Sequence, residues 1–102
     1  MDNFHRALLE AIDEGFLALG ESVRQALYWH LENHFSLKRD EIPNKPKEFA
    51  DALKNIFGAG AEVLFKIIVK RLYKKLNLTF EDVKGWSFMD YIENARKSIK
   101  GV

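Results

Sequence analysis

The sequence predicts an all-α fold, a compact orthogonal bundle of about five helices joined by short helical turns. Apolar residues recur every three or four positions along most of the chain, and no segment alternates apolar and polar residues with a period of two. The chain has 102 residues, of which 47% are hydrophobic and 30% charged. This is the size and composition of one globular domain, so we expect a single domain over residues 1–102.

Two helices are expected in the first third of the chain. The first begins near Asp2 or Asn3 and ends at Gly20, where its apolar periodicity stops. Gly15 lowers the helix propensity of this segment, which indicates either a close helix crossing or a break. The second helix is expected over residues 21–35.

Three further helices are expected in the remainder. Pro46 suits the first turn of the third helix, and Gly58 ends it. The fourth covers about residues 60–76 and ends at Asn77 in a left-handed conformation. Ser87, followed by an acid three residues later, forms a capping box that opens the fifth helix.

A similar pattern of apolar and acidic residues occurs twice in the chain, at a spacing of 41 residues. Residues 37–42 and 78–83 share the order apolar, two variable positions, two acids, apolar. One interpretation is a pseudo-repeat of helix, helix, short helical turn and helix, in which the middle helix is shared and each acid pair opens a short helix. The alternative is that the helical periodicity of apolar residues alone produces this similarity.

The sequence contains no recognisable catalytic apparatus, so we expect neither an enzyme nor a cofactor. There is no cysteine, which excludes disulfides, thiolate metal sites and cysteine nucleophiles. Residues 58–60 are glycine-rich but follow a helix, whereas a phosphate-binding loop follows a strand. Adjacent acid pairs diverge around a helix and do not converge on one substrate atom.

His30 and His34 lie one helical turn apart, a spacing that can hold a metal ion. Leu31 occupies the position where the zinc-protease motif carries its acid. We therefore interpret both histidines as buried side chains that bond to the backbone. A metal-dependent enzyme built on them is the weakest of three functional hypotheses.

The expected fourth helix carries five cations and no acid between residues 66 and 76. These cations share one side of the helix, and Val63 and Ile67 project into the middle of it. Two cations of the last helix extend the candidate set. The candidate partner-binding residues are Val63, Lys66, Ile67, Lys70, Arg71, Lys74, Lys75, Arg96 and Lys97.

The first hypothesis is a non-enzymatic interaction or regulatory module that binds a protein partner through this basic and apolar face. The alternative is nucleic-acid binding through the same face. A short helix at about 79–83 before the fifth helix has helix-turn-helix spacing, but the fifth helix starts with apolar and acidic residues that do not suit a major groove. In a third interpretation the face has no binding role: another helix covers Val63 and Ile67, and the lysines extend past it into solvent.

The charge is divided along the chain. Residues 1–35 carry six acids and two bases, and residues 36–102 carry nine acids and fourteen bases. This division indicates either an anionic partner or attraction between the two parts. The single glutamine, with abundant lysine and glutamate, favours a heat-adapted source.

The start of the chain has neither a basic segment nor an apolar run, so we expect no signal peptide, no membrane contact and a cytoplasmic location. Leu9, Phe16 and Leu17 lie off the main apolar stripe of the first helix. Either that helix is buried on a broad front or it makes a homodimer contact.

Several short segments match the helix corners and core positions of a known family. They are Leu19-Gly20-Glu21-Ser22-Val23, Glu41-Ile42-Pro43, Phe49, Leu53, Ile56-Phe57-Gly58-Ala59-Gly60-Ala61 and Leu72-Tyr73. Over about residues 7–76 the chain resembles small archaeal all-helical domains, the Nitrosopumilus output domain group, some of which occur in signalling proteins. The resemblance implies a fold and an archaeal source, but no catalytic residues.

Overall fold

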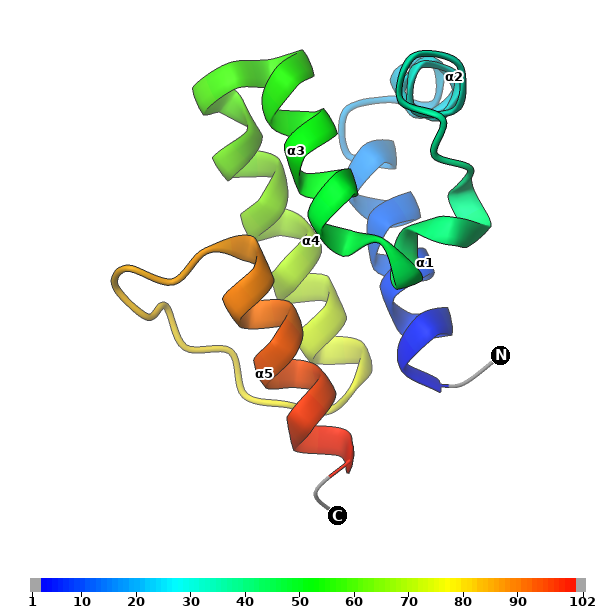
Figure 1. The fold of residues 1–102 in the computed structure, drawn as a ribbon. Helices are drawn as coiled ribbons and strands as arrows, with labels where there is room; N and C mark the ends of the chain where they lie inside the picture. Colours follow the sequence, from blue (N-terminus) through cyan, green and yellow to red (C-terminus); the bar gives the residue numbers. More distant parts are fainter. Residues whose placement is uncertain (1–2, 101–102) are drawn as a thin grey trace.

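The computed structural model describes residues 3–100 and forms an all-α bundle, as predicted (Figure 1). The α-helices are α1 (Asn3–Leu17), α2 (Glu21–Phe35), α3 (Pro46–Phe57), α4 (Ala61–Lys75) and α5 (Phe88–Lys100), with 3-10 helices η1 (Arg39–Asn44) and η2 (Gly58–Gly60). Asp2, one expected start of the first helix, lies outside the described residues. None of the described helices is long and apolar enough to cross a bilayer.

Local sequence signals set the helix ends. Pro46 occupies the first turn of α3, where its missing N–H leaves no hydrogen bond unmade. Gly58 ends α3 with a φ of 58°, and Asn77 follows α4 with the same left-handed φ of 58°. At the start of α5, the Ser87 N–H donates to the Asp90 carboxylate at 2.8 Å and the Asp90 N–H donates to Ser87 Oγ at 3.3 Å. This reciprocal pair is the predicted capping box.

Helices α1 and α4 pack closely at the centre of the bundle. A Cβ atom at Gly15 would lie only 2.8 Å from Cγ1 of Ile68, so the glycine marks a close helix crossing and not a break. Leu9 and Phe16 are buried, which shows that α1 is covered on a broad front. Leu17 is 45% exposed, so this part of the off-stripe set faces solvent.

A row of aromatic rings crosses the core and joins four helices. The ring of Phe16 from α1 lies 6.2 Å from that of Phe49 in α3. Phe49 lies 6.1 Å from Phe88 of α5, which stacks at 4.7 Å on Phe65 of α4. Such contacts between aromatic rings add about 0.5–1.5 kcal/mol each beyond the area they bury.

A polar cluster joins α1, α2 and η1. Arg39 donates to both carboxylate oxygens of Asp13, at 2.6 and 3.2 Å, and the Tyr28 hydroxyl donates to the same carboxylate. Burial alone would raise the pKa of Asp13, but the hydrogen bonds from Arg39 and Tyr28 outweigh it and lower this pKa. Burial and the neighbouring carboxylate raise the pKa of Tyr28.

The predicted short helix at residues 79–83 is wrong, because residues 78–83 are irregular and no helix-turn-helix forms there. Phe80 instead stacks on Tyr91 with ring centroids 5.6 Å apart, and its ring edge meets Tyr73. The N–H of Val83 donates to the Tyr91 hydroxyl at 2.9 Å. These contacts with α4 and α5 hold the segment extended over the bundle and replace the hydrogen bonds of a helical turn.

The pseudo-repeat holds for the order of the long helices but fails at the short turn. The acid pair of residues 40–41 lies in η1, where Glu41 accepts a hydrogen bond from the Lys38 N–H at 2.9 Å. The second acid pair has no helix to open. In Figure 1, α2 is seen along its axis beside α1, whereas α4 is seen from the side, so the two helix pairs are also arranged differently.

Candidate interaction surface on α4

Helix α4 buries one side and exposes the other. The buried residues are Ala61, Leu64, Phe65, Ile68, Val69, Leu72 and Tyr73. On the outer side Val63 is 68% exposed, the highest value among the large apolar residues described as exposed, and Ile67 is half-buried. The interpretation in which another helix covers both residues is therefore wrong for Val63.

Three lysines surround these apolar residues at successive helical turns. Lys66 forms an ion pair with Asp82 at 2.9 Å, which raises the pKa of Lys66 and lowers that of Asp82. The ammonium of Lys70 lies 5.7 Å from the centre of the Phe80 ring. Neither Lys70 nor Lys74 forms an ion pair with any residue that the structure describes. Two of the three lysines are therefore available to an anionic partner.

Arg71 and Lys75 face α1 and not the outer surface of α4. Arg71 bonds Glu14 at 3.2 Å, and Lys75 bonds Glu14 at 2.5 Å and Glu10 at 3.6 Å. The hydrogen bonds from Lys75, and then from Arg71, lower the pKa of Glu14. Here the acidic first part of the chain and the basic second part attract each other within the fold, because acids of α1 pair with bases of α4.

Arg96 and Lys97 lie apart from the outer side of α4. The guanidinium of Arg96 is half-buried 4.9 Å from the centre of the Phe4 ring, and it donates to the Pro43 carbonyl at 3.4 Å. Lys97 of α5 borders a shallow hollow, which Trp86 also lines. Of the nine residues proposed from the sequence, Val63, Lys66, Ile67 and Lys70 line one shallow hollow on α4. Lys74 follows Lys70 by one helical turn, and we call these five residues the α4 face.

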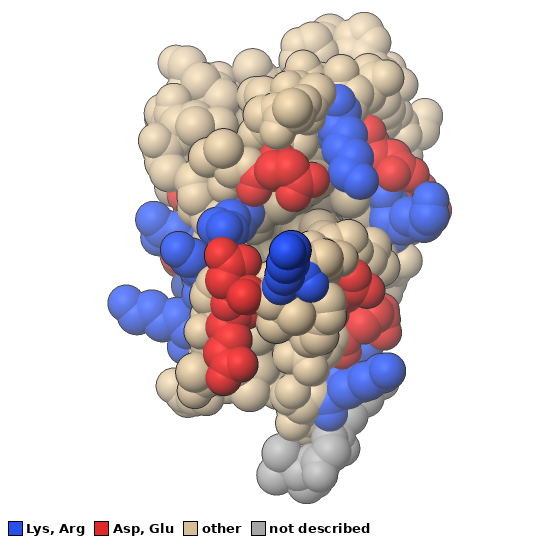
Figure 2. Space-filling model, turned by 90° about the vertical axis from the view of Figure 1, so that its left-hand side faces the viewer, with Lys and Arg blue, Asp and Glu red and all other residues tan. Residues whose placement is uncertain are grey.

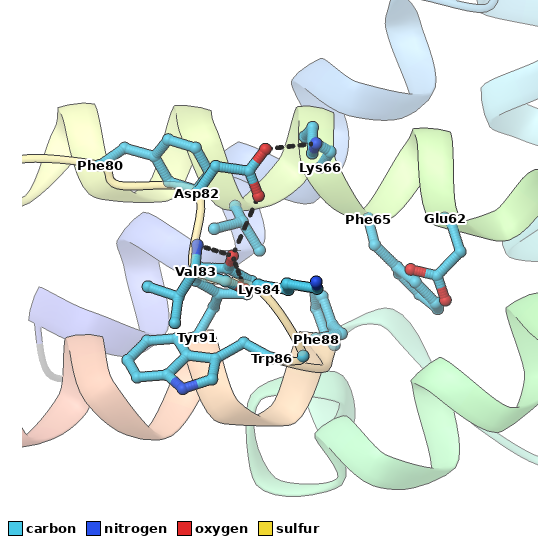
Figure 3. Close-up of a pocket in the computed structure, with 12 residues that line it drawn as sticks. Glu62, Phe65, Lys66, Phe80, Asp82, Val83, Lys84, Trp86, Phe88 and Tyr91 are labelled. Carbon is cyan, nitrogen blue, oxygen red and sulfur yellow. Dashed lines mark hydrogen bonds and ion pairs between the residues drawn. The ribbon is translucent and has the colours of Figure 1, made fainter.

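A pocket of about 210 Å³ opens beside the α4 face, under the irregular segment before α5. Figure 3 shows Glu62 and Phe65 on the α4 side of the pocket, and Val83, Lys84 and Trp86 on the side of the irregular segment. Its remaining lining residues are Lys66, Val69, Phe80, Asp82, Gly85, Phe88 and Tyr91. Lys66 of the α4 face also lines the pocket, and Glu62 borders both, so the pocket and the α4 face form one continuous surface.

The pocket was not predicted from the sequence, because residues 79–83 were expected to be helical. The available signal was the density of aromatic residues in this part of the chain. Phe80, Trp86 and Tyr91 fall within twelve positions, more than a surface turn needs.

The expected burial of His30 and His34 is wrong, since both side chains are exposed. Helix α2 packs on the bundle through Leu27 and Leu31, with Tyr28 half-buried at their side. The apolar side of α2 is therefore rotated towards Tyr28, which leaves both histidines on the outer side. The described residues include no group of three metal-ligating side chains.

Comparisons of the chain with protein-family models, with curated proteins and with solved structures find no match. The function of the α4 face and its pocket is therefore inferred from geometry and charge. The surface offers exposed apolar atoms, two lysines without ion pairs and an adjacent pocket lined by aromatic and charged side chains. An exposed apolar surface beside cations is a feature that a partner can cover.

Proposed function

We propose that this domain is a non-enzymatic interaction module that binds an acidic amphipathic segment of a protein partner on the α4 face. The observation that carries the proposal is the 68% exposure of Val63 beside a row of lysines. A large apolar side chain exposed in this way gains free energy when a partner covers it, by about 25 cal/mol per Å².

The spacing of the α4 face suits a helical partner. Val63 and Ile67 form one row at a spacing of four, and Lys66, Lys70 and Lys74 form a second row at the same spacing. A partner helix with an apolar stripe beside an acidic stripe complements both rows at once. The adjacent pocket can accept one larger apolar side chain, which would anchor the partner in register.

Nucleic-acid binding is the alternative and has weaker support. A phosphate backbone favours a continuous basic surface, and each phosphate contact contributes a salt-dependent gain. Glu62 and Asp82 interrupt the basic residues of α4, and Arg96 and Lys97 lie on other parts of the surface. Figure 2 shows acidic and basic side chains interspersed on the side of the molecule that carries the irregular segment.

Several related expectations belong to the same proposal. The resemblance to archaeal output domains fits a binding role, together with an archaeal, heat-adapted source and a cytoplasmic location. A homodimer is an alternative use of the α4 face, in which a second copy is the partner. The hypothesis of a metal-dependent enzyme has the least support, because among the described residues no third candidate ligand joins His30 and His34.

The proposal is tested with a fluorescent acidic amphipathic peptide of leucine and glutamate, its lysine counterpart and a short DNA duplex. We expect the acidic peptide alone to bind in an anisotropy titration, and binding to weaken as salt is added. Val63→Ser and Lys74→Glu should each weaken binding by about tenfold or more. Lys38→Glu, which makes the same charge change beside η1, should leave it unchanged.

Equal binding of both peptides would contradict the proposed charge complementarity. Preferential binding of the DNA duplex, lost in Lys74→Glu, would favour the alternative function. A sedimentation measurement of the protein alone, with a mass of two chains that Val63→Ser returns to one, would identify a second copy as the occupant.

A further inference from the structure

We propose that His30 and His34 form a binding site for a divalent transition-metal ion, such as Zn²⁺, Ni²⁺ or Cu²⁺, on the outer side of α2. The site is separate from the α4 face and independent of the function proposed for it. Both histidines are exposed, and they follow one another by one helical turn.

The two imidazole rings already lie side by side. Their centroids are 5.0 Å apart and their planes are inclined by 27°, so both rings project from the helix in a similar direction. Zn²⁺ and related ions bind imidazole nitrogen at about 2.0–2.1 Å. Small changes in side-chain torsions can bring one nitrogen of each ring to a common ion, because both histidines are exposed and their ring neighbour, Trp29, is itself exposed.

The nitrogens of both rings are available. Neither His30 nor His34 forms a hydrogen bond or an ion pair with any described residue, and their ring contacts are with each other and with Trp29. A structural role would bury these rings or bond them to the backbone. Free imidazole lone pairs at this spacing are instead the donor set that transition metals prefer.

The chemistry of the site defines its ligand class. Imidazole suits Zn²⁺, Ni²⁺ and Cu²⁺, whereas Mg²⁺ and Ca²⁺ prefer oxygen ligands. The described residues provide no third ligand, so water or a second copy of the chain completes the coordination. Binding with one ion per chain and binding with one ion per two chains are both consistent with this site.

Trp29 provides a built-in reporter. Its ring centroid lies 5.2 Å from that of His30 and 5.4 Å from that of His34, and the indole is 56% exposed. An open-shell ion such as Cu²⁺ held by these imidazoles will quench the fluorescence of this indole. The second tryptophan, Trp86, lies in the pocket beside α4 and is replaced by phenylalanine to isolate the signal.

The test uses tag-free protein, with Cu²⁺ titrated in the Trp86→Phe background and Zn²⁺ titrated by calorimetry in the unmodified chain. We expect saturable quenching by Cu²⁺ and saturable heat with Zn²⁺, and neither with Mg²⁺. His30→Ala and His34→Ala should each weaken binding by about tenfold or more, since each removes one of two ligands. The matched control His5→Ala, on α1, should bind as the parent does.

Both histidines are exposed, so their substitution leaves the core unchanged, and far-ultraviolet circular dichroism of each variant checks the fold. The proposal is overturned if Zn²⁺ and Cu²⁺ show no saturable binding. It is equally overturned if the double variant lacking both imidazoles binds as tightly as the parent protein.

Discussion

Replacing Gly15 by alanine tests the packing that orients α4. The added Cβ would stand 2.8 Å from Cγ1 of Ile68 and 3.7 Å from Cδ1 of Leu64. Ile68 is fully buried, and its Cγ1 is a branch atom close to the backbone, so it has little freedom to move away. The substitution should therefore push α1 and α4 apart.

Two opposing effects set the size of the change in the free energy of unfolding. Alanine stabilises a helix by about 1 kcal/mol relative to glycine. Overpacking of a core contact costs about 1–3 kcal/mol. The net result for Gly15→Ala is a loss of stability of up to about 2 kcal/mol, although the residue itself is the better helix former.

Urea unfolding, followed by circular dichroism, measures this loss, and a second background identifies its cause. Ile68→Ala removes the obstructing Cγ1 atom and itself costs about 2–5 kcal/mol. In that background Gly15→Ala should stabilise the domain by about 1 kcal/mol, because only the helix propensity remains. The same effect of Gly15→Ala in both backgrounds would show that the close contact with Ile68 is not what requires a glycine.

Three further predictions concern stability. Asp13→Asn should cost about 1–3 kcal/mol at neutral pH, because it weakens the hydrogen bonds from Arg39 and Tyr28. The lowered pKa of Asp13 means that this contribution is present above the ordinary carboxyl value of 3.8 and is lost as the pH falls through the lowered value, so urea unfolding should show parent and variant converging in acid. Ser87→Ala should cost about 1 kcal/mol in thermal unfolding by removing the cap of α5, and an unchanged midpoint would count against the capping box. Val63→Ser should change the stability by less than about 0.5 kcal/mol, since its side chain is exposed; a larger loss would mean that Val63 supports the fold.

Four helix boundaries could be predicted because their signals are local, whereas α1 ends at Leu17 and not at the predicted Gly20, which precedes α2. Pro46, Gly58, Asn77 and Ser87 each act on the backbone within a few residues, and each has the predicted role in the structure. The segment 78–83 could not be predicted in this way. Its conformation depends on contacts of Phe80 and Val83 with residues of α4 and α5, and no local pattern encodes those contacts.

The candidate surface was partly predictable for the same reason. Helical periodicity was enough to place Val63 and Ile67 among lysines on one side of α4. The inward direction of Arg71 and Lys75 depends on Glu10 and Glu14, which the fold brings close from α1. A helical wheel describes one helix and gives no information on which neighbour supplies an opposite charge.

The orientation of α2 shows the same limit of periodicity. Val23, Leu27, His30, Leu31 and His34 fit one stripe on the wheel, but Leu27, Leu31 and Tyr28 define the packed side in the structure. The half-buried hydroxyl of Tyr28 reaches Asp13 of α1, and this distant contact favours the rotation that exposes both histidines.

Binding at the α4 face can be mapped directly by NMR of the isotope-labelled domain with the acidic amphipathic peptide. If the peptide binds the α4 face, the largest chemical-shift changes fall on Val63, Ile67, Lys70 and Lys74, with the indole N–H of Trp86 responding at the edge of the pocket. Changes centred on α2 or on the outer side of α3, with the α4 face unperturbed, would contradict the proposed binding site.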